Sequence, residues 1–354
     1  MTKKLLKQVV GIDVSQKKLD VSLGRMDEET MTQIYAYKTF DNNVRGFMAL
    51  ILWVKKNTES VAPLRFVMEA TGVYHECLAY YLSGKSYLLS IVMPNKITNF
   101  FRTLEVKTVT DKSMSAAIAM FGLEKNPSNW TPPKKAYREL RQITRERDQL
   151  MTERTMIKNQ LHSEEVEAHP NAKTIERMKM RILMLNGQIK EIMAEVKATV
   201  KNDAEITKAM KLILTIPGIG ELTGATILAE TDGFALITNK RQLTSYAGLD
   251  VKLKDSGTSV HGKPRISKKG NKYLRKAMHL PALAAIWHTE EYKAIFERVF
   301  ENSGIKMKGV VAVQRKLLEM VYTIFKTQQP YESGYMEKQA KKKQELKLKM
   351  ADVC

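Results

Sequence analysis

In the first 125 residues, some segments alternate hydrophobic and polar positions with the period of a β-strand, and others repeat them with the period of an α-helix. Alternating or continuous apolar runs predict three strands, and the short polar turns between them predict an antiparallel meander. Helix and strand patterns then follow each other, and the last strand is expected to stop at Pro94. The expected strands cover residues 7–13, 18–24, 33–39, 65–69 and 88–92, and the expected helices lie around residues 47–54, 74–83 and 111–121.

Two of these strands end in a carboxylate, Asp13 and Glu69. Three antiparallel strands followed by alternating helix and strand is the order of a ribonuclease-H-like fold, in which the first and fourth strands lie side by side. Both acids would then project at the same edge of the sheet, where ligand sites of open α/β sheets form. Asp111 begins the last helix, which can pack across that edge.

Three converging carboxylates repel one another unless a cation is bound. Mg²⁺ suits them because it takes hard oxygen ligands, and a pair of such ions can clamp the two oxygens of a phosphodiester exchange. In the plainer alternative, Asp13 and Glu69 are solvent-facing strand ends and Asp111 is the N-cap of its helix.

Residues 126–205 are expected to form a linker and a coiled coil. Prolines mark the linker, and two arms of heptad-spaced residues follow on either side of a break at residues 169–171. The arms predict an antiparallel helical hairpin, a dimerisation element, or both; two long helices packed on their own domain are the alternative. Arg147 and Arg154 occupy seam positions, but a charged side chain does not suit a core that excludes water. These two arginines could instead face nucleic acid. The seam positions are Leu140, Ile143, Arg147, Leu150, Arg154, Ile157 and Leu161, then Ile175, Met178, Ile182, Leu185, Ile189, Ile192 and Val196.

Residues 206–330 are expected to form a mainly helical domain. A Pro-Gly-Ile-Gly sequence at 217–220 lies between two helical patterns and is typical of a helix-hairpin-helix. Its Gly218 and Gly220 would let the backbone approach a phosphate without reading base sequence. The alternative is a plain glycine-rich turn between helices.

Ser256 lies beside a glycine, ahead of a run of cations. A serine in such a loop is a candidate nucleophile, although its hydroxyl needs activation. Four cations that follow could stabilise negative charge developing on a phosphate. They are Arg265, Lys268, Lys269 and Arg275. Taken alone, a Ser-Gly turn is usually structural.

The net charge of the chain indicates what kind of molecule it binds. The chain has 354 residues, with 58 Lys and Arg against 38 Asp and Glu, giving a net charge of +20. This excess predicts a polyanionic partner, and with the motifs above it indicates nucleic acid. The lysine-rich residues 331–354 are expected to be a basic tail that adds non-specific affinity. Two cysteines and six scattered histidines argue against a zinc site, and the absence of a signal sequence or a membrane-spanning run predicts a cytoplasmic protein.

Several motifs together resemble the DEDD transposases of the insertion-sequence family numbered one hundred and ten. The resemblance covers the chain to about residue 330. Asp111 matches the third acid of the family, but Met114 stands where the family has its fourth, and a thioether is a poor Mg²⁺ ligand. The matching segments are residues 11–15, 18–21, 68–74, 110–119, 256–262 and 265–270.

The resemblance implies a RuvC-like nuclease domain at residues 1–125 and a serine-bearing transposase domain at 206–330, joined by the coiled coil. It implies that Ser256 attacks a DNA phosphate while Asp13, Glu69 and Asp111 hold Mg²⁺. It further implies a homo-oligomer, dimer or tetramer, acting on nucleoid DNA and guided by a bridge RNA. The expected fold class is α/β plus all-α.

Two rival hypotheses follow from the same residues. A metal-only RuvC-like nuclease or junction resolvase would leave Ser256 structural. A catalytically weakened nucleic-acid-binding protein would explain Met114.

Overall fold

The computed structural model describes residues 4–332 and 334, apart from residues 71, 105, 107, 236 and 257–259. At residues 253–256, 260, 261, 263 and 264 it describes the backbone alone. Almost all of the expected basic tail, residues 331–354, therefore lies outside the described part. Contacts divide the chain into two units, Met1–Pro132 and Pro133–Cys354, so the expected coiled coil groups with the C-terminal helices.

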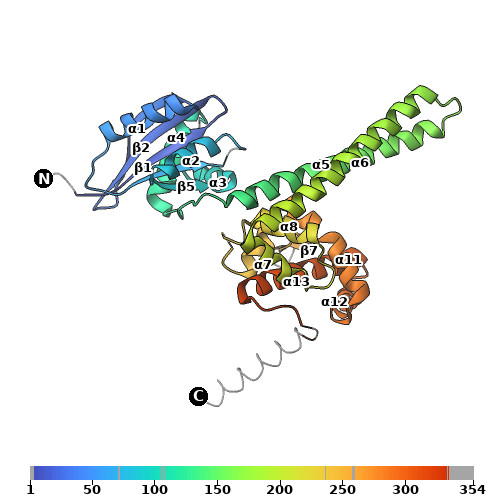
Figure 1. Cartoon of the computed structure of the whole chain (residues 1–354). Coiled ribbons are helices and arrows are strands. Elements are labelled where there is room, and N and C mark those ends of the chain that lie inside the picture. The colour runs from blue at the N-terminus through green and yellow to red at the C-terminus, as the bar shows by residue number, and fades with distance from the viewer. Residues whose placement is uncertain are drawn as a thin grey trace, which may run out of the picture. The chain divides into compact units, whose positions relative to one another are not determined.

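A five-stranded sheet forms the centre of the first unit, in the order β3-β2-β1-β4-β5 (Figure 1). β1 is antiparallel to β2 and parallel to β4, and β4 is parallel to β5. This is the strand order of a ribonuclease-H-like sheet, so that prediction is confirmed. The strands are β1 (Leu5–Val14), β2 (Lys18–Asp27), β3 (Thr32–Asp41), β4 (Leu64–Glu69) and β5 (Leu88–Val92).

Helices cover both faces of this sheet. Alternate residues of β1 point to opposite faces: Val10 and Ile12 pack with α1 (Val44–Asn57) and α2 (Glu76–Gly84), whereas Val9 packs with α3 (Pro94–Phe101) and α4 (Asp111–Lys125). Pro94 ends β5, as expected, but it also begins α3, which the sequence did not predict. The short helix η1 (Arg102–Leu104) follows α3.

Helix α4 lies unusually close to β1 and β2. A Cβ on Gly11 would come within 2.3 Å of the Ala119 backbone nitrogen, so only glycine permits this approach. The hydroxyls of Ser22 on β2 and Ser115 on α4 are 2.8 Å apart in a buried hydrogen bond. These contacts hold the first half of α4 against β1 and β2.

The second unit begins with a helical hairpin, α5 (Lys135–Glu165) and α6 (Ala172–Asn202), which lie side by side in Figure 1. On α6 every expected seam position is buried or half-buried, from Ile175 to Val196, as are the expected positions on α5. Arg154 donates a hydrogen bond of 2.9 Å to Asn186 across the hairpin. The supercoiled geometry of this pair stays a prediction.

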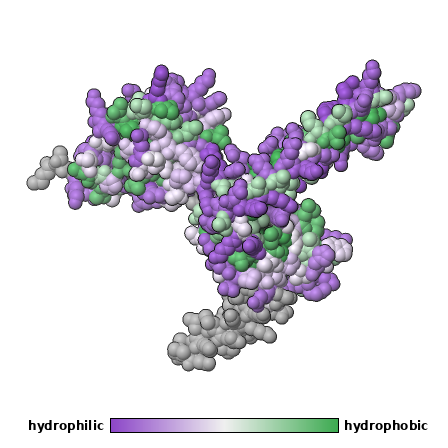
Figure 2. Space-filling view, in the orientation of Figure 1, coloured by the Kyte–Doolittle hydropathy of each residue, from purple (hydrophilic) through white to green (hydrophobic). Residues whose placement is uncertain are grey.

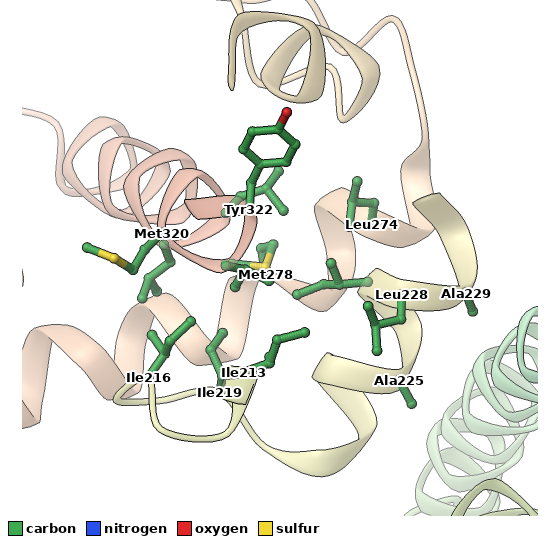
Figure 3. Close-up of a cluster of buried hydrophobic side chains, with 14 of the residues drawn as sticks. Ile213, Ile216, Ile219, Ala225, Leu228, Ala229, Leu274, Met278, Met320 and Tyr322 are labelled. Atoms are coloured by element: carbon green, nitrogen blue, oxygen red, sulfur yellow. The ribbon is translucent and has the colours of Figure 1, made fainter. Parts of the chain in front are cut away.

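A helical body packs against the base of the hairpin through α7 and α8. Its core contains Ile213, Ile219, Leu228, Met278 and Tyr322, which converge from helices and from the turns between them in Figure 3. Its elements are α7 (Ala204–Ile213), α8 (Glu221–Thr231), α9 (Lys240–Tyr246), β6 (Val251–Ser256), β7 (Val260–Ile266), α10 (Lys272–Ala277), α11 (His279–His288), α12 (Glu290–Ser303) and α13 (Lys306–Thr327). Among the described helices, none has the length and apolar character needed to cross a bilayer.

Candidate functional site

Acidic side chains form a row across the sheet at the carboxyl ends of β1 and β4. The register that pairs Ile12 with Met68 places Asp13 beside Glu69. Asp13 is itself paired with Asp20 on β2. Residues opposite one another in a sheet share a face, so these three side chains lie on the face that α4 covers. Asp111 is the first residue of α4.

The electrostatics of the row are unfavourable without a cation. Asp13 is half-buried, and this burial raises the pKa of its carboxyl from 3.8 to about 6, with the negative charges of Glu69, Asp111 and Asp20 adding to the shift. The backbone hydrogen bond of Val14 opposes it only in part. A nearby positive ion would relieve both the repulsion and the loss of solvation.

Asp111 is not the N-cap of its helix, so that part of the plainer alternative is wrong. Thr110 takes the cap: its hydroxyl accepts the Ser113 backbone N–H at 3.1 Å, and Ser113 in turn accepts the Thr110 N–H at 2.8 Å. The reciprocal pair satisfies the helix end without the carboxylate of Asp111, which stays exposed.

Met114 is half-buried against the apolar cluster beneath α4, which includes Val9, Val67 and Ile118. Its side chain thus fills packing space rather than presenting a donor to the row. The oxygens of Asp13, Glu69 and Asp111 fit Mg²⁺ by chemistry, since all are hard donors. As they stand, no three His, Cys, Asp or Glu side chains in the described part of the chain are close enough together to hold a metal ion. Binding of an ion therefore requires the side chains of Asp13, Glu69 and Asp111 to turn toward one another.

Ser256 is the last residue of β6 in a two-stranded hairpin, where its backbone pairs with Val260 of β7. The tip at residues 257–259 lies outside the described residues, and so does the Ser256 side chain. The serine belongs to the second unit, whereas the acidic row belongs to the first.

The predicted phosphate-binding cations lie on β7 and the segment after it. Arg265, Lys268 and Lys269 are exposed. Arg275 is half-buried, and its guanidinium donates a 2.7 Å hydrogen bond to the Ala247 carbonyl. That contact fixes the turn around Gly248, so Arg275 has a structural role that the sequence did not predict.

The two glycines of the Pro-Gly-Ile-Gly turn have different environments. Gly218 adopts a φ of +83°, and a Cβ there would lie 2.5 Å from the Pro281 carbonyl oxygen. Packing against α11 therefore explains Gly218. Gly220 precedes α8 with open space around it, which leaves the backbone accessible. Phosphate binding by this turn stays a prediction.

Sequence reasoning missed a buried acid in the second unit. Glu230 on α8 is 2 % exposed and is held by Arg145 of α5 in a bidentate ion pair of 2.7 and 2.8 Å. Asn271, which caps α10, donates a third hydrogen bond to the same carboxylate at 2.5 Å. The signal in the sequence was an acid that directly follows the apolar run 227–229 of a helix.

Comparison with known families finds two sequence profiles along the chain. A profile described as a transposase, of the IS110 DEDD type, matches residues 10–170. A second, described as the transposase IS116/IS110/IS902 family, matches residues 210–297.

Individual relatives agree with these profiles. A pilin gene-inverting protein of Moraxella bovis is 27% identical over 335 residues, covering 94% of this chain and 99% of the relative. An uncharacterized 43.6 kDa protein of insertion element IS110 from Streptomyces coelicolor is 26% identical over 122 residues, 34% of this chain and 30% of that protein. The solved structure of Thermus thermophilus RuvC matches 35% of this chain and 99% of its own, at 9% identity and a TM-score of 0.28. Because this TM-score is low, the ribonuclease-H-like fold of the first unit is assigned from its strand order alone.

Proposed function

Because the chain belongs to the IS110-type DEDD transposases, we propose that it cuts and rejoins DNA strands at the ends of an insertion element and at its target. The observation that carries this proposal is the acidic row: Asp13 and Glu69 on adjacent parallel strands, with Asp111 at the start of the helix above them. Transposase activity follows from the family; the assignment of roles to residues is our proposal.

We assign the metal-binding role to Asp13, Glu69 and Asp111. Bound Mg²⁺ would supply positive charge for the phosphate oxygens and the leaving oxygen. The ion would stabilise the ionised form of Asp13 in particular, since burial first, and then the negative charges of Glu69, Asp111 and Asp20, raise the pKa of its carboxyl to about 6. Its ionised form is fully populated only above that pH.

We assign the nucleophile to Ser256. Its hydroxyl oxygen would bond to phosphorus as the bond from phosphorus to a deoxyribose oxygen breaks. The serine loses a proton and the departing oxygen gains one, so the covalent phosphoserine keeps the energy needed to rejoin strands. The exposed cations Arg265, Lys268 and Lys269 follow Ser256 in the same region and would hold the DNA backbone.

DNA is the proposed partner, together with a bridge RNA that pairs with donor and target. The net charge of +20 supports a polyanionic partner and does not distinguish the two nucleic acids. A homo-oligomer is supported by the hairpin, where Met156, Met180, Leu183 and Met184 are each more than half exposed. Figure 2 shows apolar surface interrupting the hydrophilic surface of this hairpin.

Covalent trapping tests the proposal. Full-length protein is incubated with Mg²⁺, DNA carrying the element ends and the RNA transcribed beside its gene, then denatured and run on a gel. We expect a slower protein–DNA band that disappears in Ser256→Ala and persists in the matched control Ser259→Ala. Strand cleavage that survives Ser256→Ala would instead establish a metal-only nuclease. DNA binding with no cleavage, unaffected by Asp13→Asn, would establish a binding protein.

A further inference from the structure

The acidic row extends one strand beyond the residues assigned above. Asp20 on β2 is directly opposite Asp13, and Thr39 on β3 is directly opposite Asp20. Directly opposed residues project from the same face with Cβ atoms about 5 Å apart. Asp20 therefore adjoins Asp13 on the face covered by α4, on the side away from Glu69.

The carboxylate of Asp20 is buried and held in one orientation. The residue is 8 % exposed, and its Oδ1 accepts hydrogen bonds from the Tyr37 hydroxyl at 2.5 Å and the Thr39 hydroxyl at 2.7 Å. Both donors reach the same oxygen. Within the described part of the chain, Oδ2 receives no hydrogen bond and Asp20 forms no ion pair, but Oδ2 is not among the enclosed atoms that lack a partner, so solvent reaches it.

Two hydrogen bonds to one oxygen fix the carboxylate and leave the other oxygen available to a ligand. A metal-binding carboxylate is commonly oriented in this way, by hydrogen bonds to one oxygen while the other meets the ion. Tyr37 and Thr39 provide that orientation here.

Position 114 supplies the complementary observation. Met114 faces the apolar cluster of Val9, Val67 and Ile118, so the first turns of α4 bring only Asp111 to the row. An ion bound at Asp13 would thus have one carboxylate ligand fewer from α4 than in the resembled family, which carries an acid at position 114. The opposite neighbour of Asp13, on β2, carries the unpaired oxygen.

We propose that Asp20 is a fourth carboxylate ligand of the divalent cation, supplied by β2 because the helix carries methionine at position 114. Tyr37 and Thr39 are its positioning residues. The proposal rests on the proposed function, in which Asp13 and Glu69 hold that cation. It replaces a ligand from α4 with one fixed in the sheet.

Mn²⁺ binding by the full-length protein tests this without requiring DNA cleavage. Mn²⁺ serves as the probe, and the free ion is counted by electron paramagnetic resonance during titration. Asp20→Asn is expected to weaken binding at least about tenfold, as is Asp13→Asn. The control is Asp41→Asn, which removes the same charge from an exposed position on β3, where Asp41 pairs with Lys18 at 2.7 Å. Its affinity is expected to be unchanged.

The outcomes separate this inference from the proposed function. Wild-type affinity in Asp20→Asn, with loss in Asp13→Asn, would overturn the role of Asp20 and leave the metal site standing. Wild-type affinity in both variants, or no binding by the wild type, would overturn both. If Asp20→Asn fails to fold, the double variant Tyr37→Phe/Thr39→Val keeps the acid and removes its positioning. Weaker Mn²⁺ binding by that variant supports the inference, and unchanged binding overturns it.

Discussion

Replacing Asp13 by asparagine is expected to stabilise the metal-free protein above pH 6 and to weaken its response to Mg²⁺. Burial, then the charges of Glu69, Asp111 and Asp20, raise the pKa of Asp13 from 3.8 to about 6. A carboxyl group that holds its proton more tightly in the folded state destabilises that state as it ionises. The penalty therefore grows as the pH rises through this interval and is complete above pH 6.

The magnitude follows from the size of the shift. About two pKa units correspond to roughly 3 kcal/mol, and solvent around a half-buried group reduces this to about 1–2 kcal/mol. Urea unfolding of the full-length protein at pH 8 and pH 5 measures it, with a smaller difference between variant and wild type at pH 5. Tryptophan fluorescence reports the first unit, because Trp53 and Trp130 pack against its core while Trp287 is already 83 % exposed.

Urea unfolding in the presence of Mg²⁺ is the second part of this test. An ion that binds only the folded state raises its stability, so the wild-type transition should move to higher urea when Mg²⁺ is added. The Asp13→Asn transition should move less, while the exposed control Asp41→Asn should behave as wild type. A variant less stable than wild type at pH 8 without metal would refute the reasoning, since it would mean that the ionised carboxylate is favourably placed.

Three further changes test the packing. Gly11→Ala is expected to cost at least about 2 kcal/mol in urea unfolding, because its Cβ would lie 2.3 Å from the α4 backbone; Gly84→Ala, with open space around it, should shift stability by less than about 0.5 kcal/mol. Glu230→Gln leaves the Arg145 guanidinium without its charge partner and is expected to cost about 2 kcal/mol in thermal unfolding followed by circular dichroism; an unchanged midpoint would contradict this. Leu183→Glu, on an exposed part of α6, should lower the mass measured by light scattering if the hairpin joins protomers.

The sheet and the positions of two acids were predictable because they depend on local patterns. Apolar runs of strand length fix where β1 and β4 end, and the order of elements then makes Asp13 and Glu69 neighbours. The hairpin seam was predictable for the same reason. Spacings of three and four mark the buried side of α6 whatever the helix packs against.

Features that depend on tertiary neighbours were missed. Asp20 occupies a polar position in an alternating strand, which ordinarily faces solvent; only the close approach of α4 and the hydroxyls of β3 bury it. Pro94 reads equally well as a strand stop and as the first residue of a helix. The sequence analysis considered Asp111 alone as the possible cap of α4, whereas the reciprocal hydrogen bonds with Ser113 give that place to Thr110.

The ion pair between Arg145 and the buried Glu230 has a mechanical consequence. Arg145 lies on a 31-residue helix, about 45 Å long, and Glu230 also grips Asn271, where the cation-bearing segment ends and α10 begins. Because Glu230 binds Arg145 and Asn271 at the same time, α5 cannot shift at this point without straining the hydrogen bond that holds Asn271. The position of the long helix is thereby tied to the end of the segment that carries Lys268 and Lys269.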